Sequence, residues 1–259
     1  PLEASGLPRL GGTVKMARVI TVLDTDVWSK VAQYLRSDLP FSVNFSGEGK
    51  LQLGISSYGF AISPQKLMAT GLEVKKALKK ATDRSVRLVS SKDELHLSTP
   101  QVIHNDLDRS GYEIVVLRSG GKTIVARTIA EQDIAAYTRR DQLRPKRDAR
   151  VGMLPPKLAQ TLINLASGKV SDSNTEKLRV LDPFCGTGVV LQEALLMGYT
   201  AAGSDLEPRM IAYTKANLEW LAQAFQIETD DAPLEVGDAT NITWATKFDL
   251  VASETYLGQ

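Results

Sequence analysis

The fold of the second half of this 259-residue chain is decided by the stretch Leu181-Asp182-Pro183-Phe184-Cys185-Gly186-Thr187-Gly188. A short β-prone segment, residues 178–181, leads into it, and an apolar segment of helical length, residues 189–197, follows it. Glycines between a strand and a helix let backbone N–H groups approach a ligand closely at the helix N-terminus. The stretch therefore predicts a ligand-binding loop at the carboxyl end of a strand in an open α/β sheet.

The glycine spacing differs from both common nucleotide-binding fingerprints. The stretch has neither the G-x-G-x-x-G pattern of dinucleotide folds nor the terminal Gly-Lys-Ser/Thr of phosphate loops. It opens with a carboxylate, Asp182, which suits an ammonium group better than a phosphate where water is partly excluded. We therefore expect an amino-acid-like ligand.

Three further strand-like segments end in polar residues. Asp205 follows residues 200–204 at roughly twenty residues past the first glycine, the offset at which an acid reaches ribose hydroxyls in doubly wound folds. An amphipathic helix is expected from Leu206 to Phe225, and Pro208 is tolerated in its first turn. Two more strands, 234–236 and 248–252, lead into Gly237-Asp238-Ala239 and Ser253-Glu254-Thr255-Tyr256. Four polar strand ends on one rim predict a site for a ribosyl ligand.

In combination, these motifs make the segment from about Val151 to the end resemble a class I S-adenosylmethionine-dependent methyltransferase. The resemblance implies a doubly wound Rossmann-like domain with S-adenosylmethionine as its cofactor. It implies that Asp182 and the loop hold the methionine moiety, Asp205 the ribose hydroxyls and Asp238 the adenine amine. The cofactor-binding residues expected on this basis are Asp182, Phe184, Cys185, Gly186, Thr187, Gly188, Asp205, Leu206, Asp238 and Ala239.

The end of the fourth strand departs from the pattern of this class. Amino-group methyltransferases of this type carry Asp or Asn, then Pro-Pro, then an aromatic residue, whereas residues 253–256 keep only the aromatic one. Glu254 can accept a hydrogen bond from an exocyclic amine, and stacking of Tyr256 on a base is worth roughly 1 to 3 kcal/mol. We expect Ser253, Glu254 and Tyr256 to be catalytic, although a rearranged strand end also fits weak or lost catalysis.

The first half predicts a smaller α+β module. A strand is expected over 51–59, a basic amphipathic helix over 64–80 and a strand over 85–90. A hairpin joins 111–118 to 122–128 through Ser119-Gly120-Gly121. An earlier helix over 24–36 places Trp28, Val31 and Leu35 on one apolar face. This order of elements ahead of a methyltransferase domain resembles a THUMP module, an RNA-binding domain of tRNA-modifying enzymes.

The connecting residues 130–159 extend that resemblance, because the whole is similar to THUMP-containing tRNA guanine-N2-methyltransferases. It implies a THUMP-like RNA-binding region over 1–130, a basic linker over 131–150 and a partial methyltransferase domain over 151–259. The implied activity is methyl transfer from S-adenosylmethionine to the exocyclic N2 amine of a guanosine in tRNA. The sheet of such a domain continues past a fourth strand, so we expect the chain to be truncated there.

The formal net charge of +1 is almost neutral, so nucleic-acid binding must come from local clustering. The candidate RNA-binding residues are Arg139, Arg140, Arg144, Lys146 and Arg147. A charge run of this kind is also typical of a solvated linker between domains. Two other functions stay open: a non-catalytic RNA-binding module with a degenerate methyltransferase domain, and a DNA amino-methyltransferase, which the RNA-binding front module disfavours.

Cysteine and histidine counts limit the chemistry. With Cys185 as its single cysteine the chain forms no internal disulfide, and with two histidines no metal centre is expected. Cys185 has no histidine nearby in sequence and is interpreted as a packing residue. No apolar run reaches transmembrane length, and residues 1–13 lack the pattern of a secretory signal. The sequence predicts a cytoplasmic protein without membrane partners and leaves its oligomeric state open.

Overall fold

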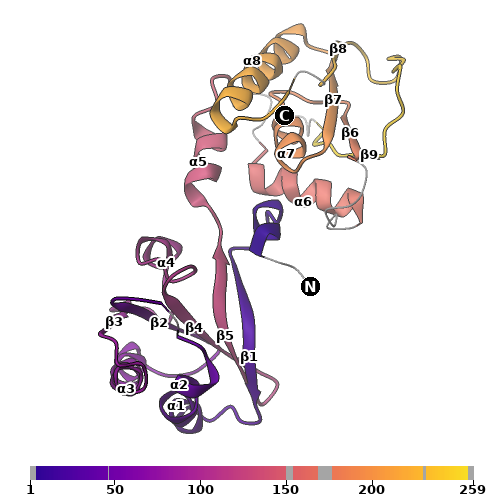
Figure 1. The fold of residues 1–259 in the computed structure, drawn as a ribbon. Coiled ribbons are helices and arrows are strands. Elements are labelled where there is room, and N and C mark those ends of the chain that lie inside the picture. The colour runs from indigo at the N-terminus through magenta and orange to yellow at the C-terminus, as the bar shows by residue number, and fades with distance from the viewer. Residues whose placement is uncertain (1–3, 46, 150–153, 169–176, 230–231, 256–259) are drawn as a thin grey trace. The chain divides into compact units, whose positions relative to one another are not determined.

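The computed structural model describes residues 4–45, 47–149, 154–168, 177–229 and 232–255. They form two compact units, one within Pro1–Leu7 and Val14–Gln132 and one within Pro8–Thr13 and Asp133–Gln259. Each unit contains its own sheet, in line with the predicted α/β fold with two sheets (Figure 1). A short 3-10 helix, η1 (Ala4–Arg9), begins the described chain. Within the described residues, no helix is both long and apolar enough to cross a membrane.

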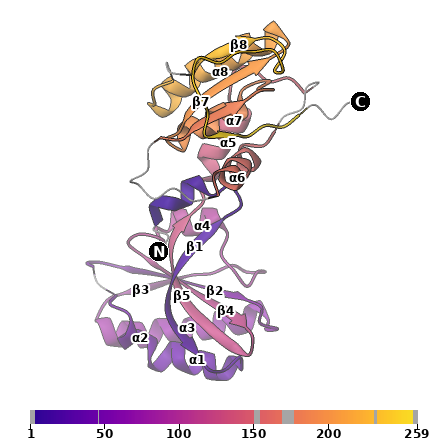
Figure 2. The same ribbon diagram turned by 90° about the vertical axis from the view of Figure 1, so that its right-hand side faces the viewer.

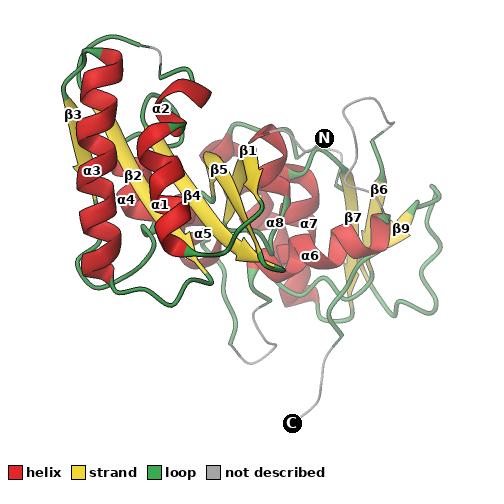
Figure 3. Ribbon diagram, turned by 90° about the horizontal axis from the view of Figure 1, so that it is seen from below, coloured by secondary structure: helices red, strands yellow, loops and turns green. Residues whose placement is uncertain are grey.

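The first unit is a five-stranded mixed sheet with helices packed against it. The strand order is β1-β5-β4-β2-β3. The strands are β1 (Lys15–Leu23), β2 (Leu51–Tyr58), β3 (Val86–Val89), β4 (Tyr112–Ser119) and β5 (Lys122–Glu131). The helices are α1 (Trp28–Ser37), α2 (Leu39–Ser42), α3 (Pro64–Thr82) and α4 (Thr99–His104). Helices α1 and α3 lie side by side and bury their apolar faces in one core with the sheet (Figure 3).

The predicted hairpin is confirmed, since β4 and β5 pair antiparallel from Ser119 opposite Lys122. Gly120 and Gly121 turn the chain with φ of +55° and +78°, backbone angles that glycine adopts without steric cost. The predicted helix over 24–36 begins four residues later, at Trp28. The sequence reasoning missed β1 and α4.

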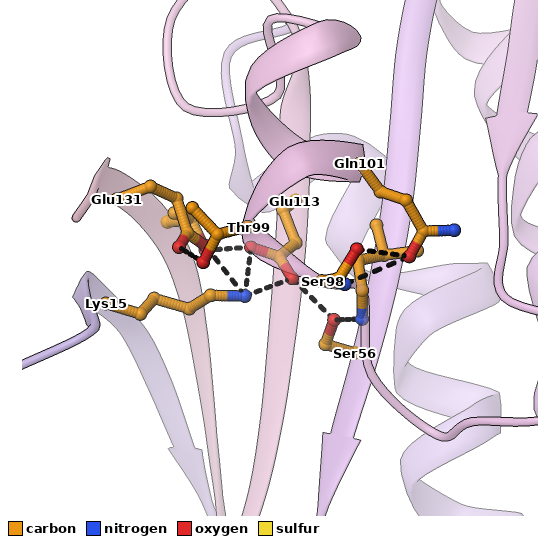
Figure 4. A network of polar contacts seen from close by, with 9 residues as sticks. Lys15, Ser56, Ser98, Thr99, Gln101, Glu113 and Glu131 are labelled. Carbon is orange, nitrogen blue, oxygen red and sulfur yellow. Dashed lines mark hydrogen bonds and ion pairs between the residues drawn. The ribbon is translucent and has the colours of Figure 1, made fainter. Parts of the chain in front are cut away.

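A buried charge network ties four strands of this sheet together (Figure 4). Glu113 on β4 is fully buried, and its carboxylate oxygens accept hydrogen bonds from Lys15 Nζ at 2.6 and 2.7 Å. The hydroxyls of Ser56 on β2 and Thr128 on β5 also donate to this carboxylate, at 2.5 Å each. Lys15 on β1 pairs in addition with Glu131 at 3.0 Å. The fully satisfied carboxylate therefore fixes β1, β2 and β5 around β4.

The second unit is built on a parallel four-stranded sheet with the order β8-β7-β6-β9. The strands are β6 (Arg179–Asp182), β7 (Thr200–Asp205), β8 (Leu234–Val236) and β9 (Leu250–Val251). The helices are α5 (Ile134–Gln142), α6 (Pro156–Ser167), α7 (Val189–Leu196) and α8 (Pro208–Phe225). Figure 2 shows the sheet of this unit with its helices from a second direction. The first strand, β6, has β7 on one side and β9 on the other, so the direction of winding reverses beside it, where open α/β sheets bind ligands.

Two features of this unit differ from expectation. The fourth strand, predicted as a compact buried strand over 248–252, is limited to Leu250 and Val251, and Val251 is 56% exposed. The predicted length and full burial of this strand are wrong. Within the described sheet β9 is an edge strand that pairs with β6 alone, so one of its sides is left open. Residues 134–142, expected within a linker, form α5, whose Tyr137 is buried.

Candidate active site

The loop between β6 and α7 has the shape that its glycines predict. Gly186 has a φ of +53° and Gly188 a φ of +83°, both in the left-handed region that favours glycine. The Gly188 N–H donates to the carbonyl of Cys185 at 2.7 Å, which closes a tight turn. A Cβ atom at position 186 would meet open space, so the loop backbone is accessible at this point.

Asp205, at the end of β7, supports this loop directly. Its Oδ2 accepts a hydrogen bond from the Gly186 N–H at 2.9 Å, and its Oδ1 accepts one from the Glu207 N–H at 3.0 Å. The acid predicted to contact a ribose therefore lies beside the glycine loop, and it also holds the loop in place.

Asp182, at the end of β6, is the buried acid of the site. It is 2% exposed, and its Oδ1 accepts hydrogen bonds from the Phe184 N–H at 3.1 Å and from Ser253 Oγ at 2.5 Å. Burial raises the pKa of Asp182 to about 7, the two hydrogen bonds oppose this shift, and the nearby acids Asp205 and Glu254 add to it. Within the described residues its second oxygen, Oδ2, has no hydrogen-bond partner.

A pocket lies over the loop and includes Asp182. The described residues that line it are Leu154, Asp182, Phe184, Cys185, Gly186, Thr187, Val189, Val190 and Glu254. This lining contains two acids and no basic side chain, so the pocket favours a cationic ligand over an anionic one. Leu154, Val189 and Val190, which the sequence reasoning did not single out, supply apolar walls.

The segment after β9 contributes the second acid of the pocket, Glu254. Glu254 is exposed and lines the same pocket as Asp182, so the structure brings these two predicted site residues together. Ser253 is half-buried, and its hydroxyl is engaged by Asp182. Tyr256 lies outside the described residues, so its stacking on a base stays a prediction.

Asp238 and Ala239 lie in the turn after β8. The Gly237 N–H donates to the backbone oxygen of Asp205 at 3.0 Å, which places this turn beside the end of β7. Asp238 Oδ1 accepts from the N–H and the hydroxyl of Thr240 at 2.9 and 2.8 Å, and these bonds lower the pKa of Asp238. Asp238 and Ala239 are not among the residues that line the pocket described above, and neither is the exposed Leu206.

Cys185 is 5% exposed, and burial raises the pKa of its thiol to about 12. A thiol with this pKa stays protonated at neutral pH and packs as a small apolar group. Across the described residues, no group of three or more His, Cys, Asp or Glu side chains is placed to hold a metal ion.

Two residues of α8 that the sequence reasoning missed hold the loop from behind. Thr214 Oγ1 donates to the Gly186 carbonyl at 2.8 Å, and Asn217 Nδ2 donates to the Thr187 carbonyl at 2.8 Å. Asn217 also exchanges two hydrogen bonds of 2.9 Å with the backbone of Lys146. These partners lie about thirty residues beyond the loop, on an ordinary amphipathic helix, and no local sequence signal marks them.

The basic cluster divides into exposed and buried residues. Arg139, Lys146 and Arg147 are exposed. Arg140 is 7% exposed, and its Nε donates to Glu193 Oε1 at 2.7 Å; Arg144 is 3% exposed. The guanidinium groups of Arg140 and Arg144 are therefore not available to RNA at this surface, and the expected RNA contact rests on the three exposed residues.

A parallel doubly wound sheet with a glycine loop after its first strand and an acid after its second is the arrangement of class I S-adenosylmethionine-dependent methyltransferases. Residues 144–256 match the family model of the UPF0020, RMKL-like methyltransferase domain. The matched segment contains the glycine loop and both acids of the pocket.

Curated relatives carry a more specific name. The chain is 46% identical over 68 residues to the tRNA (guanine(10)-N2)-dimethyltransferase of Methanothermobacter thermautotrophicus, a match covering 26% of this chain and 18% of that protein. It is 34% identical over 108 residues to the enzyme of the same name from Pyrococcus abyssi, covering 40% of this chain and 29% of that protein. The matches thus span less than a third of either relative.

Solved structures show the same fold. SMU.472, solved as a candidate methyltransferase in complex with SAH, superimposes with a TM-score of 0.51 at 14% sequence identity. This likeness covers 97% of the present chain and 68% of SMU.472, and at such low identity it bears on the fold alone.

Proposed function

We propose that this protein transfers a methyl group from S-adenosylmethionine to the exocyclic N2 amine of a guanosine in tRNA. The observation that carries the proposal is the acidic pocket, where Asp182 and Glu254 lie at the glycine loop. The names of the partial relatives, both tRNA guanine-N2 enzymes, support the choice of acceptor.

The residues of the pocket fit a ligand with the charge of S-adenosylmethionine. Asp182 Oδ2 is free to accept from an ammonium group, and the open backbone at Gly186 suits close approach of the methionine portion. Asp205 would hold the ribose hydroxyls, and the turn at Asp238 would lie at the adenine end. When bound, S-adenosylmethionine supplies an electrophilic methyl group on a positively charged sulfonium.

The chain's own contribution to the reaction would be orientation of the acceptor. Glu254 faces the pocket and would accept a hydrogen bond from the guanosine amine, while Tyr256 would stack on the base once it leaves the RNA stack. Holding amine and methyl donor in line converts a bimolecular reaction into an effectively unimolecular one.

RNA binding is assigned to two parts of the chain. The first unit, predicted as a THUMP-like region over residues 1–130, would bind tRNA. The exposed side chains of Arg139, Lys146 and Arg147 would contact phosphates. These contacts would place the acceptor nucleotide at the methyltransferase unit.

A calorimetric titration of S-adenosylmethionine into the full-length protein tests the proposal, with Asp205→Ala as its companion variant. We expect binding in the native protein and a loss of at least about tenfold in affinity in the variant, because Asp205 holds both the loop and the predicted ribose site. Methyl transfer from labelled cofactor to tRNA is then measured. A folded native protein that binds no S-adenosylmethionine would refute the proposal.

One observation favours a second function, an RNA-binding module without catalysis. The strand end at 253–256 lacks the Asp or Asn and both prolines of the related amino-methyltransferases. The two functions differ in the consequence of replacing Glu254, which is given among the predictions below.

A further inference from the structure

Ser253 connects the strand end of β9 to the glycine loop. The Ala252 N–H donates to the carbonyl of Leu181 at 3.0 Å, so the chain leaving β9 is fixed beside the end of β6. From this position, Ser253 Oγ donates to Asp182 Oδ1 at 2.5 Å. The bond joins two segments 71 residues apart in the sequence.

The two carboxylate oxygens of Asp182 differ in their hydrogen bonds. Oδ1 accepts from both Ser253 Oγ and the Phe184 N–H, while Oδ2 keeps no hydrogen-bond partner within the described part of the chain. Asp182 is 2% exposed, so few alternative orientations are open to its carboxylate. The two bonds to Oδ1 therefore set the direction in which Oδ2 points.

The residue type at position 253 suits this contact. In the related amino-methyltransferases an Asp or Asn stands there. A carboxylate at position 253 would face the buried Asp182 at hydrogen-bond distance, an arrangement in which two acids cannot both ionise easily. A serine hydroxyl instead donates a hydrogen bond and stabilises the ionised form of Asp182.

We propose that Ser253 is a positioning residue, which holds the Asp182 carboxylate toward the ammonium group of the cofactor and does not itself accept from the target amine. The inference rests on the proposed function, because it assumes that the pocket takes S-adenosylmethionine. On this view Ser253 is not catalytic, contrary to the expectation from the sequence. The hydrogen bond from the target amine is then accepted by Glu254.

Binding of a cationic ligand at Asp182 depends on pH. The groups that act on Asp182 are Ser253 and the Phe184 N–H, which lower its pKa, and Asp205 and Glu254, which raise it; the neighbouring Cys185 stays neutral. A cationic ligand binds the carboxylate form, so affinity increases as the pH rises through the pKa of Asp182. Loss of the serine hydroxyl removes a stabiliser of that form and moves the midpoint to higher pH, by about 1 unit.

The test measures binding of S-adenosylhomocysteine to the full-length protein by calorimetry, from about pH 5 to about pH 9, a range that brackets the titration. This probe has the ammonium group but transfers no methyl group, so the readout is independent of activity. Four proteins are compared: the native protein, Ser253→Ala, Ser253→Thr, and Thr161→Ala as a matched hydroxyl deletion on α6, where Thr161 bonds to the carbonyl of Lys157.

We expect the midpoint of Ser253→Ala to lie about 1 pH unit above that of the native protein, with roughly tenfold weaker binding near neutral pH. Ser253→Thr, which keeps the hydroxyl, should restore the native midpoint, and Thr161→Ala should leave it unchanged. The KM for tRNA should be the same in Ser253→Ala as in the native protein.

Two results would overturn the inference, and they can be told apart. If Ser253→Ala binds the probe with the native midpoint but loses kcat, Ser253 contacts the target amine and the proposed function stands. If the native protein binds neither S-adenosylmethionine nor the probe, the proposed function fails as well.

Discussion

A side chain at Gly188 would collide with Thr214, because a Cβ atom at position 188 would lie 2.8 Å from Thr214 Cγ2. Thr214 cannot easily withdraw, since its hydroxyl donates to the Gly186 carbonyl at 2.8 Å. The methyl group of Thr214 thus leaves no room for a side chain at position 188, and its hydroxyl holds the backbone of Gly186. The loop after β6 is therefore shaped by α8 as well as by its own sequence.

Gly188→Ala should lower the free energy of unfolding by roughly 1–3 kcal/mol, because the variant combines a positive φ with a close contact to Thr214. Urea denaturation measures this change. Gly12→Ala is the control, since a Cβ there would meet nothing within 4 Å. Equal stabilities for the two variants would contradict this prediction, because they would mean that the loop shifts enough to relieve the contact with Thr214.

Arg140→Ala should cost about 3–5 kcal/mol of stability, because it leaves the buried carboxylate of Glu193 without its charged partner, although Gln160 Nε2 still donates to Oε2. Burial raises the pKa of Glu193 to about 7, and Arg140 opposes the shift, so its loss favours the protonated acid. The exposed neighbour Arg139 gives the matched variant: Arg139→Ala should change stability by about 0.5 kcal/mol or less and weaken tRNA binding instead. Thermal unfolding and a tRNA filter-binding assay distinguish the two.

Glu113→Ala should destabilise the first unit by about 3–5 kcal/mol, since it removes the acceptor shared by Lys15, Ser56 and Thr128. The surface pair of Arg36 and Glu73, with half-exposed side chains, is the comparison. Glu73→Ala should cost no more than about 1 kcal/mol. Chemical denaturation followed by circular dichroism reports both values. A small effect of Glu113→Ala would mean that the network adds little to the stability of the sheet.

Asp182 should make the unliganded protein less stable as the pH rises. Its pKa in the folded state, about 7, lies above the ordinary value of 3.8 for an aspartate, so the folded state holds its proton more tightly than the unfolded chain does. This contribution to stability is complete below about pH 4 and is lost as the pH rises through about 7, a difference on the order of a few kcal/mol. Melting temperatures across this range should fall more steeply for the native protein than for Asp182→Asn.

Glu254→Ala in the full-length protein should abolish methylation of tRNA while cofactor binding is retained, because Asp182, the buried acid of the pocket, stays in place. Transfer of a labelled methyl group and calorimetry measure the two quantities. An unchanged rate would remove Glu254 from the reaction. Absence of methylation in the native protein, with tRNA binding intact, would favour the non-catalytic RNA-binding module.

The glycine loop and the strand ends of the second unit could be predicted because their signals are local. A glycine pair after a short β-prone segment and an acid after the next such segment are visible in a few residues, and parallel pairing brings them together. The edge strand β1 was missed because its side chains are partly exposed on both faces and show no clear alternation.

Long-range partners explain the other differences. Arg140 looks like any member of a basic run, and its burial depends on Glu193, 53 residues further along. Lys15 and Glu113 are separated by 98 residues, so their charge pair could not be foreseen from either neighbourhood. The bond between Ser253 and Asp182 likewise needs the strand order before it can be seen.

The amide of Asn217 has a consequence that reaches beyond the loop. Its Oδ1 accepts a hydrogen bond from the Lys146 N–H, and its Nδ2 donates to the Lys146 carbonyl. The same Nδ2 also donates to the carbonyl of Thr187 in the glycine loop. One fully buried side chain thus fastens the basic segment that we propose for tRNA to the loop that we propose for the cofactor. If tRNA binding moves this segment and thereby changes the affinity for the cofactor, cofactor binding must change the affinity for tRNA by the same factor.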